Sequence, residues 1–214
     1  MKVCLLVCFL VLGRCVFAQE MVFVFLHHRT DAPELPKKQL DSLMAEHLAN
    51  IGKMAGEGKL LVAGPFEGGG GILILNTSSM EQAAQWINED AAVRTNRWKV
   101  EFQSYQSRTG KPQLVSEPII MTNYHFVRFV TYVAKFNIND VPELLKKHDD
   151  YVKDLVKTGN VVAEGTFGDS EGGILVIKGD LNKAVIESDP AVREGFLEVE
   201  FKKLYVARGA FSEK

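Results

Sequence analysis

The chain has 214 residues, of which 46% are hydrophobic and 24% charged, and its formal net charge is −2. It contains no basic run or stripe, which argues against nucleic-acid binding because that binding depends on Lys and Arg neutralising phosphates. Beyond an N-terminal leader, two halves of roughly 100 residues remain, each long enough to bury a core of its own.

Residues 1–18 are predicted to be a signal peptide that is cleaved after Ala18. Lys2 gives a positive start, an apolar run follows over 3–12, and residues 16–18 provide the small residues of a cleavage site. The run is too short to cross a bilayer, which takes about 20 apolar residues. The leader also holds every cysteine: Cys4, Cys8 and Cys15. We therefore expect a secreted or periplasmic protein without disulfides or thiol chemistry and without membrane contact after cleavage.

The first half alternates strand-like and helix-like patterns. Leu43, His47 and Ile51 share one apolar helical stripe with Leu40, Met44, Leu48 and Met54. The expected elements are, in chain order, a strand over Met21–Leu26, a helix over Lys37–Gly56, strands over Leu60–Ala63 and Ile72–Leu75, a helix capped by Ser78 with Glu81, and a strand over Trp98–Tyr105.

The second half repeats this order after a proline-containing linker at residues 108–123. The expected elements are a strand over Phe126–Val133, a helix over Val141–Thr158, a hairpin over Val161–Ile177, a short helix near Asn182–Glu187 and a strand over Leu197–Val206.

The halves also share a residue pattern. Counted from His47 or His148, a glycine falls at +11, a second at +17 and a phenylalanine at +19 in both copies. An Asp-x-Ala-Val-Arg block recurs later, beginning at Asp90 and Asp189. Such a repeat indicates two domains of one ancestry, so functional residues should occur at positions present twice.

The element order β-α-β-β-α-β is that of the ferredoxin-like unit. One face of such a sheet is bare, and we expect it to expose Phe23, Phe25, Val100 and Phe102, more apolar surface than a monomer tolerates. The predicted fold is therefore α+β, with two ferredoxin-like (βαββαβ) domains at residues 21–107 and 124–210. These would pack sheet to sheet as an intrachain dimeric α/β barrel, with a pocket between them that both histidines border.

His47 and His148 are the candidate catalytic residues, because each lies in the middle of an apolar helical stripe. A buried imidazole beside a carboxylate suits acid–base chemistry, but it can equally be a core histidine bonded to a backbone carbonyl. Asp90 and Asp189 either orient these histidines or cap short helices. Arg94 and Arg193 either bind an anionic substrate or pair with the aspartates four residues earlier.

No cofactor or metal site is predicted. The run Gly68–Gly71 lacks the Lys-Ser/Thr that follows a phosphate-binding loop, so it fits a hairpin turn. His27 and His28 are adjacent on a strand and face opposite sides, which disfavours a shared metal.

The segment from His47 through Gly58 to Ala63-Gly64-Pro65, with the turn at Asp90 before the last strand, resembles the YCII-related family. The second copy matches through His148, Gly165 and Asp189-Pro190, although Glu164-Gly165-Thr166 replaces Ala-Gly-Pro. The resemblance implies a dimeric α/β barrel with a His/Asp pair in a cavity, formed here by His47 with Asp90 and by His148 with Asp189.

Two functional hypotheses follow. The first is an exported tandem YCII-like protein that binds a small organic molecule and moves a proton in an elimination or isomerisation. The second is a non-catalytic ligand-binding or scaffold module of the same fold, so whether the chain is an enzyme stays open. Neither hypothesis excludes a homo-oligomer.

Overall fold

The structure, a computed structural model, describes residues 20–132, 139–168 and 171–212. The predicted signal peptide lies outside the described residues. The first half forms β1 (Glu20–His28), α1 (Lys37–Gly56), β2 (Leu60–Pro65), β3 (Gly71–Leu75), α2 (Met80–Asn88), α3 (Ala91–Arg94) and β4 (Trp98–Thr109). The second half forms β5 (Met121–Thr131), α4 (Val141–Lys157), β6 (Val161–Phe167), β7 (Glu171–Ile177), α5 (Lys183–Glu187), α6 (Pro190–Arg193) and β8 (Leu197–Ala207). The halves therefore repeat one order of elements, as the sequence predicts.

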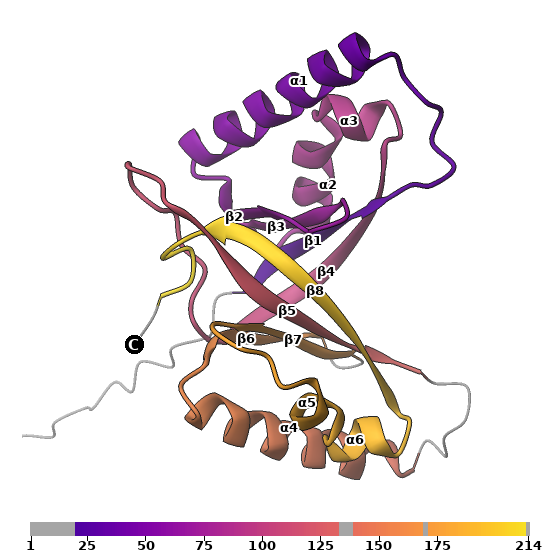
Figure 1. The fold of residues 1–214 in the computed structure, drawn as a ribbon, viewed down its shortest axis with the longest axis vertical. Helices are drawn as coiled ribbons and strands as arrows, with labels where there is room; N and C mark the ends of the chain where they lie inside the picture. Colours follow the sequence, from indigo (N-terminus) through magenta and orange to yellow (C-terminus); the bar gives the residue numbers. More distant parts are fainter. Residues whose placement is uncertain (1–19, 133–138, 169–170, 213–214) are drawn as a thin grey trace, which may run out of the picture.

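All eight strands join in one antiparallel sheet with the order β2-β3-β1-β4-β6-β7-β5-β8. The halves pair through β4 and β6. The two outermost strands also meet, because Phe66, directly after β2, bridges to Leu204 of β8, and the Glu67 N–H donates to the Lys203 carbonyl at 3.0 Å. The sheet thus returns on itself, with α1–α3 at one end and α4–α6 at the other (Figure 1).

The apolar core is divided by the two faces of the sheet. The inner face carries a cluster drawn from both halves, in which Phe23 and Phe25 of β1 lie with Phe126 of β5 and Ile174 of β7. The outer face of each half packs under its own helices, as one cluster around Val24 and another around Phe129. Burial of the inner face therefore requires both halves. No helix of the described residues is both long and apolar enough to cross a membrane.

The side chains of β4, the last strand of the first half, face the opposite sides of the sheet from those we expected. Val100 and Phe102 pack under the helices of that half, whereas Glu101 is paired with the inward-facing Phe25. Side chains alternate along a strand, so the polar set Glu101 and Gln103 enters the inner face. The expectation of a bare apolar face is right for Phe23 and Phe25 and wrong for Val100 and Phe102.

Several predicted boundaries shift. Ser79, not Ser78, caps α2, since its hydroxyl accepts the Gln82 N–H at 3.2 Å. Strands β4 and β5 extend into the expected linker and leave residues 110–120 between them, while Val133 lies outside the described residues. Leu48 does not belong to the buried stripe, because it is 65% exposed.

The second glycine of the repeat lies where the two halves touch. A Cβ on Gly165 of β6 would come within 2.5 Å of the Gln106 carbonyl oxygen and of the Tyr105 ring, both on β4. A Cβ on Gly64 of β2 would lie 2.8 Å from Leu204 and 3.0 Å from the Tyr205 carbonyl, both on β8. Glycine at +17 therefore allows each half's hairpin to approach the last strand of the other half.

We expect Gly165→Ala to lower the free energy of unfolding by about 2 kcal/mol, because the new methyl group overlaps backbone that cannot rotate away. Gly52→Ala is the matched control. Gly52 lies inside α1, nothing lies within 4 Å of the position that an added methyl group would take, and helix propensity favours alanine by about 1 kcal/mol. Urea unfolding of both variants measures the difference, and an equal response would contradict the close approach of the halves.

Candidate functional site

The first His/Asp pair joins α1 to α3. The Nδ1 atom of His47 lies 2.8 Å from Oδ2 of Asp90, and Asn50 donates to the same oxygen at 3.2 Å. The other oxygen, Oδ1, accepts the N–H groups of Ala92 and Val93 at 2.9 and 3.3 Å. Asp90 therefore caps α3 and holds His47 at once, so the two roles considered from the sequence coexist.

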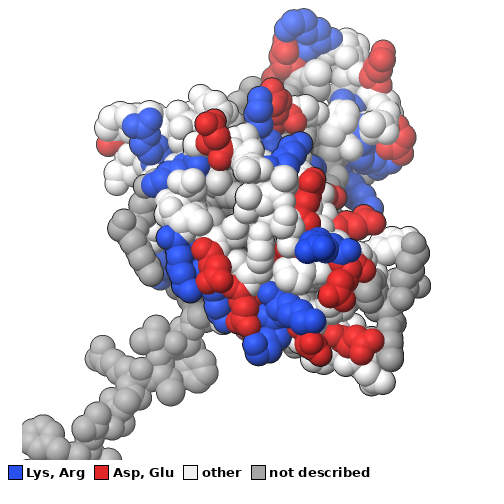
Figure 2. All heavy atoms as spheres, turned by 60° about the horizontal axis from the view of Figure 1, so that its bottom comes forward, with Lys and Arg blue, Asp and Glu red and all other residues white. Residues whose placement is uncertain are grey.

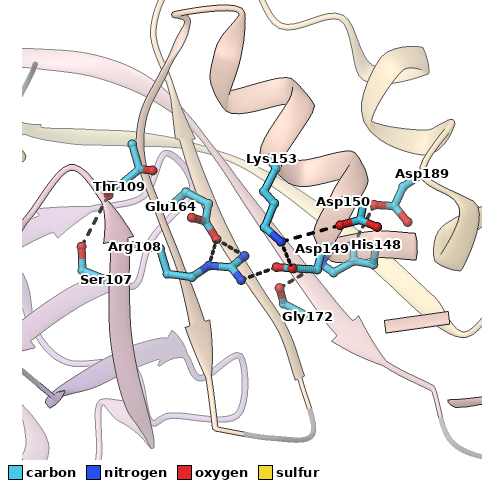
Figure 3. A network of polar contacts seen from close by, with 10 residues as sticks. All are labelled: Ser107, Arg108, Thr109, His148, Asp149, Asp150, Lys153, Glu164, Gly172 and Asp189. Carbon is cyan, nitrogen blue, oxygen red and sulfur yellow. Dashed lines mark hydrogen bonds and ion pairs between the residues drawn. The ribbon is translucent and has the colours of Figure 1, made fainter. Parts of the chain in front are cut away.

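The second pair is built in the same way between α4 and α6. Nδ1 of His148 lies 2.7 Å from Oδ2 of Asp189, whose Oδ1 accepts the Ala191 N–H at 2.8 Å (Figure 3). The proline at 190 is the first residue of α6, a position where its missing N–H costs nothing. The sequence repeat thus corresponds to two equivalent side-chain pairs.

The two pairs differ at the second ring nitrogen. Nε2 of His148 lies 3.0 Å from the Gly172 carbonyl oxygen, which can only accept, so this nitrogen carries a proton and donates it. Nε2 of His47 has no partner among the residues that the structure describes. The side chain of His148 is 5% exposed and that of His47 12% exposed. His47 therefore has one ring nitrogen to spare, and His148 has none.

The connection between the hairpin strands also differs between the halves. In the first half the position before the glycine that begins β3 is Gly70, and its carbonyl accepts the Phe66 N–H at 3.0 Å. The second half has one residue more between Phe167 and the corresponding Gly173, and the carbonyl before that glycine, that of Gly172, lies 3.0 Å from Nε2 of His148. The half with the longer connection is thus the one whose imidazole is bonded at both ring nitrogens.

The carboxyl group of Asp90 is held in its ionised form. Burial alone would raise its pKa, but the hydrogen bond and charge of His47, with the bonds from Asn50 and the Val93 N–H, outweigh burial and lower the pKa. An ionised Asp90 accepts from Nδ1–H of His47, and in the neutral imidazole the lone pair is then on Nε2.

The arginines do not join these pairs. The Arg94 guanidinium donates to the Glu89 carbonyl at 2.9 Å on the surface. Arg193 is also exposed, and among the described residues neither arginine forms an ion pair with the aspartate four residues before it. The structure therefore gives no geometric support to either sequence interpretation of Arg94 and Arg193.

One ionic cluster on the inner face of the sheet was not anticipated. Glu101 of β4 accepts two hydrogen bonds from Arg128 of β5, at 2.5 and 3.1 Å, and others from His27 at 2.7 Å and Gln103 at 2.9 Å. Burial would raise the pKa of Glu101, but these bonds lower it to about 2. The Arg128 guanidinium also lies 4.2 Å from the centroid of the Phe25 ring. The sequence does contain a signal for this cluster. Arg128 is the one charged residue in an otherwise apolar stretch of strand from Phe126 to Val130.

A second ionic cluster connects the halves on the outer side of the sheet. Arg108 of β4 donates to Glu164 of β6 at 2.8 and 2.5 Å and to Asp149 of α4, which also binds Lys153 (Figure 3). Glu164 is 4% exposed. This buried carboxylate stands where the first copy has Ala63, so the departure from the repeat marks a contact between the halves.

The predicted pocket bordered by both imidazoles is not found among the described residues. His47 and His148 lie on α1 and α4, at opposite ends of the molecule, and neither ring lines any of the four main clefts of the described residues. His47 is connected to a cleft through Trp98. The Trp98 ring centroid lies 6.3 Å from that of His47, and Trp98 borders a cleft of about 540 Å³. The Trp98 Nε1–H is buried and has no partner among the described residues.

Three comparisons place these findings among known proteins. Residues 21–101, which include His47 and Asp90, match the YCII-related domain family. No curated protein matches the chain. Among solved structures, a putative monooxygenase from Fusobacterium nucleatum subsp. nucleatum ATCC 25586 aligns with a TM-score of 0.49 and 11% identity, over 90% of this chain and 94% of that one. The first half thus carries a YCII-related domain, and the second half lies outside the matched range.

Among the described residues, no group of three or more His, Cys, Asp or Glu side chains is arranged to hold a metal ion.

We expect Glu101→Gln to destabilise the protein by about 2 kcal/mol at neutral pH, because it removes two charge-assisted hydrogen bonds from a buried guanidinium. The pKa of Glu101 is lowered on folding, so its contribution is complete above the ordinary value of 4.5 and is lost as the pH falls toward about 2. The stability difference between wild type and variant, measured by urea unfolding, should therefore shrink over this range. A difference independent of pH would contradict the assignment.

Proposed function

We propose that this chain is an exported tandem YCII-like protein whose two ferredoxin-like halves form an intrachain dimeric α/β barrel, and whose first half binds a small organic molecule for proton transfer by His47. The match of residues 21–101 to the YCII-related family and the repeated order of elements support the architecture. The predicted leader at residues 1–18 supports export.

The catalytic part of the proposal rests on the different surroundings of the two ring nitrogens of His47. Nδ1 is held by Asp90 at 2.8 Å, and Nε2 is without a partner in the described part of the chain. This arrangement fixes the tautomer whose Nε2 can accept a proton, as a general base requires. His148 is equally well oriented by Asp189, but its Nε2 is committed to Gly172. The second pair is therefore assigned a structural role.

Asp90 acts through His47 rather than on a substrate. Both of its oxygens are occupied, Oδ2 by His47 and Asn50 and Oδ1 by the backbone of α3. A single positioned base suits reactions that begin with removal of a proton from carbon, such as an elimination or an isomerisation. We assign the protein to that class of chemistry.

A non-catalytic ligand-binding or scaffold role is the second candidate. It is favoured by the absence of His47 from the linings of the four clefts and by the capping role of Asp90. In that case the His/Asp pairs only fasten the helices to one another. The two candidates differ in whether Nε2 of His47 is accessible to a small molecule.

Diethyl pyrocarbonate distinguishes them, because it acylates an imidazole nitrogen that has an available lone pair. We expect His47 to be modified in the folded protein and His148 to resist until unfolding, as measured by mass spectrometry of proteolytic peptides. Asp90→Asn should slow the modification of His47 about tenfold or more, since an amide can donate to Nδ1 and move the proton to Nε2.

The exposed His28 provides the internal reference for reagent and pH. If His47 is as resistant as His148 in the folded protein, and both react after unfolding, the catalytic proposal fails and the scaffold role remains.

A further inference from the structure

A separate cleft of about 610 Å³ lies between the two halves. The first half contributes the end of β1, with Leu26 and His28, and the tip of the β2–β3 hairpin around Glu67. The second half contributes β8 around Lys202 and the start of α5. None of the residues of the two His/Asp pairs borders this cleft, so it is distinct from the site proposed above.

The charged residues of the cleft are mainly cationic. Lys183, Lys202 and Lys203 line it, and Glu67 is the one carboxylate among its described lining residues. Glu67 binds Lys203 at 3.1 Å, which leaves two ammonium groups in excess. His27, His28 and His125 also border the cleft, and the Nε2–H of His27 is already donated to Glu101. This excess contrasts with the chain as a whole, whose net charge is −2.

Many surface charges elsewhere are paired locally. On the face shown in Figure 2, basic and acidic side chains alternate. Along α4, for example, Lys146 binds Asp150 at 2.7 Å and Lys147 binds Glu143 at 3.0 Å. The ammonium groups of Lys183 and Lys202 have no such carboxylate partner among the described residues, so their charges are not neutralised by the protein.

Each of these two ammonium groups lies over an aromatic ring, of which Phe201 lines the cleft and Phe66 belongs to the inner-face cluster beside it. Nζ of Lys183 lies 4.8 Å from the centroid of the Phe201 ring, and Nζ of Lys202 lies 4.9 Å from that of the Phe66 ring. A cation over a ring face is attracted by about 0.5–1 kcal/mol at an exposed site, which restricts a long flexible side chain without neutralising it. Leu26, Leu181 and Phe201 add apolar wall beside the charges.

We propose that this cleft binds a small carboxylic acid with an apolar body. Lys183 and Lys202 would neutralise the carboxylate, and Phe201 with Leu26 and Leu181 would contact the apolar part. Because residues of both halves line the cleft, such a ligand would bind across the boundary between them.

The test uses 1-naphthoate as the probe and 1-naphthamide, of similar shape but uncharged, as its counterpart. By isothermal titration calorimetry we expect naphthoate to bind the wild-type protein in a saturable manner and naphthamide to bind much more weakly. Lys183→Gln combined with Lys202→Gln should weaken naphthoate binding about tenfold or more, the effect of losing a charge-assisted bond. Lys38→Gln, which removes an exposed charge from α1, should leave the affinity unchanged.

Each other outcome contradicts the proposal. Equal affinities for naphthoate and naphthamide would show that the charges take no part, and equal losses in the double variant and in Lys38→Gln would show a general charge effect. Inorganic phosphate that displaces naphthoate and binds as tightly would remove the role of the apolar wall. Thermal unfolding of each variant establishes that the fold is intact, and because His47 is untouched, the outcome is independent of the proton-transfer proposal.

Discussion

The structure depends on the contact that each half makes with the last strand of the other. The inner face of each half's sheet is apolar around Phe23 and Phe126, and neither half can bury it alone. Burial requires β6 to pair with β4 and the end of β2 to meet β8, and these approaches are possible only because positions 64 and 165 lack a side chain. The glycine at a fixed spacing from the histidine is therefore required by the contact between the halves as well as by each half itself.

Charged groups determine how the halves sit within that contact. Hydrophobic burial has no direction, but Glu101 with Arg128, and Arg108 with Glu164, bind across the boundary at defined positions along the strands. A slip of one residue between strands would turn these side chains to the opposite face and leave charges buried without their partners, which is costly. The two clusters thus disfavour alternative registers more than they add to stability, since a buried ion pair recovers little beyond its own desolvation.

The sequence predicted the local elements and the side-chain pairs well, because their signals are local or repeated. Helix α1 begins and ends where periodicity and glycines indicated, and the repeat singled out His47 with Asp90 and His148 with Asp189, which do bind one another. Contacts between distant segments were beyond such reasoning. Glu101 looked like the solvent side of a strand because nothing nearby in sequence reveals Arg128, and the assignment of Val100 to the inner face failed for the same reason. Likewise, the bond from His148 to Gly172 depends on the path of a hairpin.

The two His/Asp pairs are built alike and differ at one ring nitrogen. The closed sheet needs both halves, and each Asp caps its short helix whatever the histidine does, so each pair stabilises its own half. In the second half the Gly172 carbonyl also accepts from Nε2 of His148, whereas Nε2 of His47 has no partner among the described residues. The same contact at Nδ1 therefore leaves the two imidazoles in different surroundings at Nε2, and the bonded one belongs to the half whose hairpin connection is one residue longer.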